Sequence, residues 1–261
     1  MKLSLLATMA ICLFLPAAIR AETAFALNGR NMLIRIDTNT PGFTDDNKLI
    51  RGLQPGESIL GIDFRPANGR LYGLGSQSRL YVIDTATGVA SAVGTAAFST
   101  PLEGTEFGFD FNPTVDRIRV VSNTGQNLRL HPDTGAVAAV DGRLNSEAST
   151  EFRIVGAAYT NSVAGATSTV LFGIDAEQRS LVTQNPPNDG KLNRVGMMNI
   201  DMSEVAGFDI SPRTGLAYIA ARVRGSAMAA LYEVNLTTGV TIQLGDFDRF
   251  DQIGGLAIPT R

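Results

Sequence analysis

The chain has 261 residues, with 22 Lys or Arg against 25 Asp or Glu and a formal net charge of −3. This acidic balance argues against nucleic acid and anionic membrane surfaces as partners. The chain has a single histidine, His131, so a multi-histidine metal site is excluded. A Ser-His-Asp triad would have to use this residue, but His131 lies in a turn-like run and is better explained as an exposed polar turn residue.

The first 21 residues have the features of an export signal. Lys2 precedes an apolar stretch from Leu3 to Ala18, and Ile19-Arg20-Ala21 is a suitable cleavage site. Cleavage there leaves one domain, residues 22–261, with no cysteine, because Cys12 is the only one. A disulfide framework or a thiolate zinc site is then excluded, and a sizeable core must stabilise the chain. We expect a periplasmic or secreted monomer with no membrane span.

Strand signals begin directly after this segment. Residues 23–27 and 32–37 flank a turn, and a further strand around residues 48–53 follows the loop 38–47. The clearest unit comes next, with strands predicted at residues 59–64, 70–75, 80–83 and 89–93. β-Branched and aromatic runs separated by Gly, Pro, Asn and Asp are typical of hairpins, and no segment predicts a helix of three turns.

One short phrase, Gly-x-Asp-Phe-x-Pro in its best copies, recurs every 47 to 51 residues. The glycines of its five copies are Gly61, Gly108, Gly156, Gly207 and Gly255. Four-stranded units repeated at this length predict a β-propeller, here all-β with five blades. The last unit stops after its first strand, whereas the mature chain starts with a second strand. The N- and C-terminal strands should therefore complete one blade and leave no free sheet edge at the seam.

This layout resembles the domain of unknown function 4394 family of exported bacterial propeller-like proteins. The resemblance rests on Gly61-Ile62-Asp63-Phe64-Arg65-Pro66, on Gly69-Arg70-Leu71-Tyr72-Gly73-Leu74-Gly75 and on Leu80-Tyr81-Val82-Ile83-Asp84. It covers nearly all of the mature chain, with the largest departure at residues 157–161. The resemblance implies the fold but no activity, so no catalytic residues follow from it.

Acidic residues precede each copy of the repeated glycine. They lie in the connections from the fourth strand of one unit to the first strand of the next. We call the face of the propeller that carries these connections the top. The five acids are Glu57, Glu106, Glu151, Glu204 and Asp251. Converging carboxylates at the mouth of the channel would bind a hard cation such as calcium, or a cationic ligand. The alternative interpretation is that these acids only keep the rim solvated or form ion pairs with nearby arginines.

A second group of acids occupies the innermost strands. Asp63, Asp110 and Asp209 are at equivalent positions of three repeats and should lie near the channel. Three converging carboxylates could cleave glycosidic bonds. A residue duplicated with its blade more often has the same structural role in each copy, by accepting backbone N–H groups. The sequence favours this structural role, and the absence of tryptophan removes the best sugar-stacking residue.

These observations favour a binding or interaction module that works through its top face, with an unknown small ligand or an envelope or extracellular protein as partner. The alternative is a carboxylate-based hydrolase, either a glycosidase or a calcium-dependent esterase or lactonase. The top loops are short and the longest insertions, residues 38–47 and 161–169, map to the opposite face, which disfavours catalysis.

Overall fold

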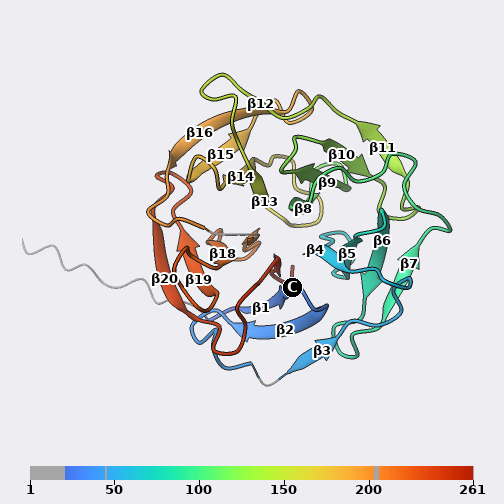
Figure 1. Cartoon of the computed structure of the whole chain (residues 1–261). Coiled ribbons are helices and arrows are strands. Elements are labelled where there is room, and N and C mark those ends of the chain that lie inside the picture. The colour runs from blue at the N-terminus through green and yellow to red at the C-terminus, as the bar shows by residue number, and fades with distance from the viewer. Residues whose placement is uncertain (1–20, 45, 203–205, 261) are drawn as a thin grey trace, which may run out of the picture.

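The computed structural model describes residues 21–44, 46–202 and 206–260, which form five sheets around one axis (Figure 1). Blade 1 contains β21 (Gly255–Ala257), β1 (Thr23–Leu27), β2 (Met32–Asp37) and β3 (Asn47–Leu49). Blade 2 contains β4 (Ile59–Phe64), β5 (Leu71–Gly75), β6 (Arg79–Ile83) and β7 (Ala90–Val93). Blade 3 contains β8 (Phe107–Asn112), β9 (Arg117–Ser122), β10 (Asn127–Leu130) and β11 (Val137–Val140).

The two remaining blades complete the ring. Blade 4 contains β13 (Ile154–Tyr159), β14 (Leu171–Asp175), β15 (Ser180–Gln184) and β16 (Lys191–Met197), with the short β12 (Asn145–Ser146) added in parallel at its outer edge. Blade 5 contains β17 (Gly207–Ile210), β18 (Ala217–Ala221), β19 (Ala230–Val234) and β20 (Thr241–Asp246). The predicted five-bladed propeller is confirmed. Among the described residues, the structure has no helix with the length and hydropathy of a membrane span.

Closure of the ring by the two chain ends is also confirmed. β21 pairs antiparallel with β1, and Phe25 lies opposite Ala257. One predicted strand of this blade is shorter than expected, because β3 ends at Leu49. The residues that follow bond to blade 2 instead: Arg51 N donates to Gly88 O at 3.0 Å, and Ala90 N donates to Arg51 O at 2.7 Å. The chain therefore connects the outer edges of blades 1 and 2.

The apolar core consists of layers between neighbouring blades. Each of the five buried clusters draws its side chains mainly from two adjacent blades. Between blades 2 and 3, for example, the rings of Tyr72 and Phe111 meet edge to face with centroids 5.1 Å apart. Alternation along the strands explains this arrangement, because both faces of every blade are covered and both need apolar residues.

The repeated glycines are explained by the crowding of the inner strands. A Cβ placed on Gly108 would lie 2.5 Å from the Cβ of Ala157 in the next blade, and one on Gly61 would lie 2.8 Å from Phe109 Cβ. The other repeat glycines are similarly close to the next blade; a Cβ placed on Gly255, for example, would lie 3.1 Å from Ile62 Cγ1. Only residues without a side chain let five inner strands approach this closely. The cavity that remains on the axis beside these glycines has a volume of about 10 Å³.

Replacement of one repeat glycine should destabilise the ring. We expect Gly108→Ala to lower the free energy of unfolding by about 1–3 kcal/mol, because its methyl group has no room against Ala157. Gly29→Ala is the control, since the nearest atom to its added Cβ would be Gln252 Oε1 at 3.5 Å. Urea unfolding of both variants measures the difference. An equal loss in the two variants would contradict this account of the repeat.

Candidate functional site

Three aspartates meet at the axis of the propeller. Asp63 in β4, Asp110 in β8 and Asp209 in β17 each offer a carboxylate oxygen, and these oxygens lie within 4.8 Å of one another. All three residues are buried, with exposures of 2–3%. The sequence placed them at equivalent repeat positions near the channel, and the structure brings them together. Among the described residues they are the one group of three or more potential metal-binding acids, histidines or cysteines at this spacing.

Backbone N–H groups of the inner strands occupy most of these oxygens. Asp63 accepts from its own neighbour, Phe64 N, at 2.6 Å and from Phe111 N of the next blade at 2.7 Å. Asp209 repeats this arrangement with Ile210 N and Ile258 N, both at 2.6 Å. Each aspartate thus joins its own inner strand to the next one.

Asp110 differs, because it accepts a single N–H. Its Oδ1 receives Tyr159 N of blade 4 at 3.0 Å. The N–H that follows Asp110, on Phe111, is already taken by Asp63. Asp110 Oδ2 therefore accepts none of the inner-strand N–H groups.

The three carboxylates together serve all five blades. In every blade, the residue after the repeat position that Asp63 occupies in blade 2 donates its backbone N–H to one of these carboxylate oxygens. The two blades without an aspartate carry Ala158 and Ala257 at that position. The aspartate of the next blade compensates in both cases by turning one oxygen to its own neighbour's N–H. Unpaired buried N–H groups are costly, so the cluster has a structural reason to exist.

The environment of the cluster favours protonated carboxyl groups. Burial, with the charge of Asp209, raises the pKa of Asp63 well above its usual range, and burial with the charges of Asp63 and Asp209 does the same for Asp110. Burial raises the pKa of Asp209 to about 7, opposed by its two backbone hydrogen bonds. We assign the most firmly held proton to Asp110, which has the fewest N–H partners.

This geometry does not suit glycoside hydrolysis. The two carboxyl groups of a glycosidase are about 5 Å or more apart and contact the sugar between them. Here the oxygens are closer together, bond to the backbone, and belong to residues that are almost fully buried. A sugar could not contact them without separating the inner strands.

The acids of the predicted top ring have separate partners. Glu57 is buried within blade 2, where it accepts the Tyr81 hydroxyl and Gln77 N. Glu106 pairs with Arg153, with 2.8 Å between Oε1 and Nη1. Glu151 and Asp251 are exposed, and Glu204 lies outside the described residues. The four described acids do not form a common carboxylate cluster, and calcium binding by the ring stays a prediction of the sequence.

One pocket on the top face was not located by the sequence pattern, although Asp251 of the predicted acid ring lines it. It has a volume of about 560 Å³ and lies between the β1–β2 turn, the β18–β19 loop and the segment before β21. Its lining residues are Asn28, Gly29, Arg30, Met32, Met228, Arg249, Phe250, Asp251 and Gln252. A smaller cavity of about 130 Å³ shares Asn28, Gly29 and Gln252 and continues to Ile253 and Gly254. The residues that line the 560 Å³ pocket are dispersed along the chain, so no local sequence motif marks the site.

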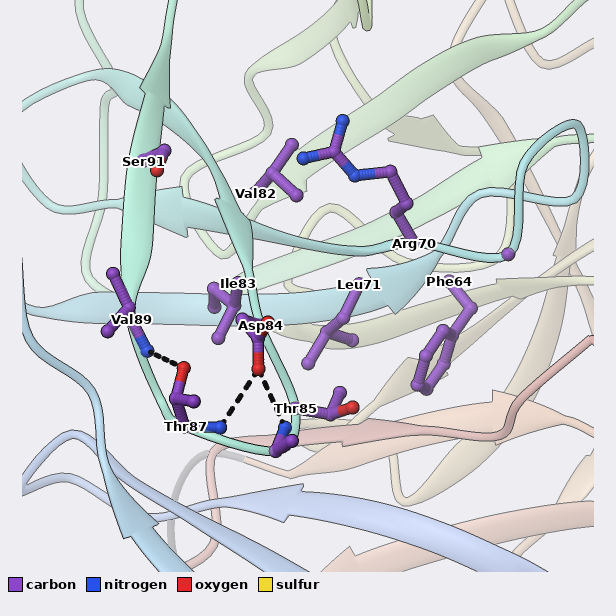
Figure 2. A pocket seen from close by; sticks show the side chains of 12 residues that line it. Phe64, Arg70, Leu71, Val82, Ile83, Asp84, Thr85, Thr87, Val89 and Ser91 are labelled. Carbon is purple, nitrogen blue, oxygen red and sulfur yellow. Dashed lines mark hydrogen bonds between the residues drawn. The ribbon is translucent and has the colours of Figure 1, made fainter.

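Two further pockets, each of about 490 Å³, open on the opposite, bottom face. The blade 2 pocket, shown in Figure 2, is lined by both charged and apolar groups, among them Arg70, Asp84 and Leu71. Asp84 accepts Ala86 N and Thr87 N there, both at 2.9 Å, and so shapes the β6–β7 turn that forms one wall. The blade 4 pocket lies between the bottom turns of blades 3 and 4.

Comparison with known proteins identifies a family. The model of the domain of unknown function DUF4394 matches residues 32–257. No curated protein matches the chain. Of the predicted export signal, residues 1–21, all but Ala21 lie outside the described residues, and the signal stays a prediction.

Similar solved structures include Kuenenia stuttgartiensis hydrazine synthase, the Dos1 propeller and a nidogen/laminin complex. Their sequence identities are 11%, 13% and 12%, with TM-scores of 0.43, 0.44 and 0.45. The matches cover 74%, 85% and 92% of this chain, and 51%, 60% and 98% of the other chains. The chain thus spans only about half the length of the hydrazine synthase chain.

The different bonding of Asp63 and Asp110 can be tested by amide substitution. We expect Asp63→Asn to lose about 1–3 kcal/mol of unfolding free energy, because each Asp63 oxygen accepts one backbone N–H and the amide NH2 group that replaces one oxygen would leave its N–H facing another donor. Asp110→Asn keeps the oxygen that serves Tyr159 and replaces a protonated carboxyl with a neutral group of the same shape, so its change should stay below about 1 kcal/mol. Chemical denaturation at pH 7 compares the two. Equal losses would contradict the assignment of the proton.

The cluster should also make the fold less stable at neutral pH and above than at acidic pH. Between about pH 4, the usual value for an aspartate, and about pH 7, folded Asp209 holds a proton that the unfolded chain has released. The contribution of Asp209 is complete below pH 4 and is lost as the pH rises through about 7. We expect the midpoint of thermal unfolding to be several degrees higher at pH 5 than at pH 8. Asp209→Asn should flatten this slope, and an unchanged slope would show that Asp209 is not its source.

Proposed function

Since the chain belongs to the domain of unknown function 4394 family, whose description assigns no activity, we propose a function from its own surface. The protein is a ligand-binding propeller that takes a small organic anion with an apolar portion into the top-face pocket. The observation that carries this proposal is the pocket itself, a cavity of about 560 Å³ over blade 1 with both charged and apolar walls. Small-molecule sites typically have about 300–1,000 Å³.

The charges of the pocket favour an anion. Arg30 and Arg249 contribute two guanidinium groups against the single carboxylate of Asp251. Neither arginine forms an ion pair with another described residue, whereas Arg153 and Arg224, which also lie towards the top, are both paired. The local charge is therefore positive on a chain whose overall charge is −3. A guanidinium group binds a carboxylate well because it can donate two parallel hydrogen bonds.

The apolar walls favour a ligand with a hydrocarbon part. Met32, Met228 and Phe250 line the same cavity, and all three side chains are partly exposed. Methionine adapts to irregular shapes, and removal of these surfaces from water would contribute to affinity. The β1–β2 turn that carries Asn28 is well ordered by its own bonds, since Asn28 Oδ1 accepts Arg30 N at 2.9 Å and Met32 N at 3.0 Å.

Octanoate is a suitable first probe because it combines a carboxylate with an apolar chain. We expect saturable binding by calorimetry, weakened about 10-fold or more in Arg249→Gln by the loss of a charge-assisted hydrogen bond. Arg224→Gln removes the same charge from the β18–β19 loop outside the pocket and serves as the matched control. Higher salt should also weaken binding, because the site is partly exposed.

Two results would overturn this proposal. One is the absence of binding by octanoate and by benzoate, a second anion with an apolar body. The other is an equal loss of affinity in Arg249→Gln and Arg224→Gln, which would show a general charge effect. A protein partner would then become the better explanation for the top face.

A further inference from the structure

We propose that the blade 4 pocket on the bottom face is a second, independent site for a neutral, hydroxyl-rich ligand, a mono- or disaccharide. Its volume is about 490 Å³. Three segments form its walls: the end of β8 with Asn112 and the turn after it, the β13–β14 loop with residues 167–170 up to the start of β14, and the end of β15 with Thr183 and Gln184 and the turn after it.

The chemistry of the lining is unusual for this protein. None of the 12 lining residues carries a charge, and most of them bear a hydroxyl or amide group. The blade 2 pocket has the same volume and the same place in its blade, but its lining includes Arg70 and Asp84 (Figure 2). The blade 4 pocket also has a wall from the preceding blade, formed by Asn112 and Thr114, which the blade 2 pocket lacks, so the two pockets differ in side chains and in walls.

Local bonds set which hydrogen-bonding groups remain available. Asn112 Oδ1 accepts Thr114 N at 3.0 Å and Thr114 Oγ1 at 2.7 Å, which leaves its NH2 group as a donor. Gln184 Nε2 donates to Pro187 O at 2.6 Å, which leaves Oε1 as an acceptor on a residue only 4% exposed. No other described residue bonds to the Thr183 hydroxyl, which can both donate and accept.

Buried bonds hold the floor of the pocket rigid. The Tyr159 hydroxyl accepts Arg119 Nε at 3.4 Å. Arg119 is itself 2% exposed, and its guanidinium bonds to Asn127 Oδ1 at 2.7 Å, Asp141 Oδ2 at 2.6 Å and Asn188 Oδ1 at 2.8 Å. A rigid floor lowers the entropic cost of ligand binding.

The β13–β14 loop is tied down in the same way. Thr169 Oγ1 donates to Thr160 O at 2.6 Å, and Val170 N donates to Thr160 Oγ1 at 2.9 Å. These bonds fix the loop wall where it leaves the blade. The pocket is thus bounded by ordered segments on both sides.

A saccharide fits this lining better than other small molecules. An organic ion would find no counter-charge among the lining side chains, and a purely apolar molecule would leave the amide and hydroxyl groups without partners. Sugar hydroxyls both donate and accept, as the available groups require. The C–H faces of a sugar can pack on Val170, Leu171 and Pro187, which supply the apolar part of the lining.

Saturation-transfer NMR with a panel of neutral sugars tests the proposal: glucose, galactose, maltose, cellobiose, lactose and trehalose. We expect at least one of them to bind saturably, and glucuronate and glucosamine to bind more weakly than the neutral parent sugar. Thr183→Val removes a hydroxyl with little change of shape and should weaken binding about 3- to 10-fold. Gln184→Ala should weaken it further.

Thr85→Val is the matched control, because Thr85 lines the blade 2 pocket and undergoes the same change. The affinity of the Thr85→Val variant for the sugar should equal that of the unmodified protein. The proposal is overturned if no sugar of the panel binds at high-millimolar concentration, or if binding survives both Thr183→Val and Gln184→Ala. Octanoate binding at the top face should be unchanged in Thr183→Val, so the two sites can fail separately.

Discussion

The approach of five inner strands to one axis is the constraint on which the rest of the structure depends. Small rings leave little room at the centre, and here the glycines near the start of each inner strand remove the side chains that would collide. The same crowding buries backbone N–H groups further along these strands, and buried N–H groups need hydrogen-bond acceptors. Three aspartates supply the acceptors for all five blades. The repeated Gly-x-Asp phrase therefore has two structural roles: the glycine gives the inner strands room to approach, and the aspartate accepts the N–H groups that this approach buries.

This solution has an electrostatic cost. Buried carboxyl groups that approach within 4.8 Å of one another cannot all be ionised easily, so the cluster retains protons that an exposed aspartate would lose. Asp110, with one N–H partner, is the natural place for such a proton. An arrangement that resembles a catalytic triad of acids is thus explained by backbone bonding and closeness, and function is better sought in the pockets of the two faces.

The fold could be predicted from the sequence because duplication repeats its signals. The period of the glycine, the alternation in residues 59–64 and the unequal chain ends together predict five blades closed by β21 and β1, as the structure shows. The equivalence of Asp63, Asp110 and Asp209 follows from the same repeat. What could not be predicted is where single side chains point. Glu57 has the spacing of a rim acid, yet it turns inward to Tyr81. The top-face pocket joins Arg30 to Arg249 from opposite ends of the chain, and no repeat relates them.

Closure by β21 and β1 has a consequence for the way the molecule is made. The pairing of Phe25 with Ala257 joins strands more than 200 residues apart in sequence, so the ring cannot close until β21 has been synthesised. Until then β1 presents an unpaired edge, and the N–H of Ile258 has not yet reached Asp209. Blades 2 to 4 can stack as they emerge, in the manner of a repeat array, whereas the final strand converts an open arc into a ring. The arrival of β21 thus decides whether the edge of β1 in a nascent chain is protected from pairing with other chains.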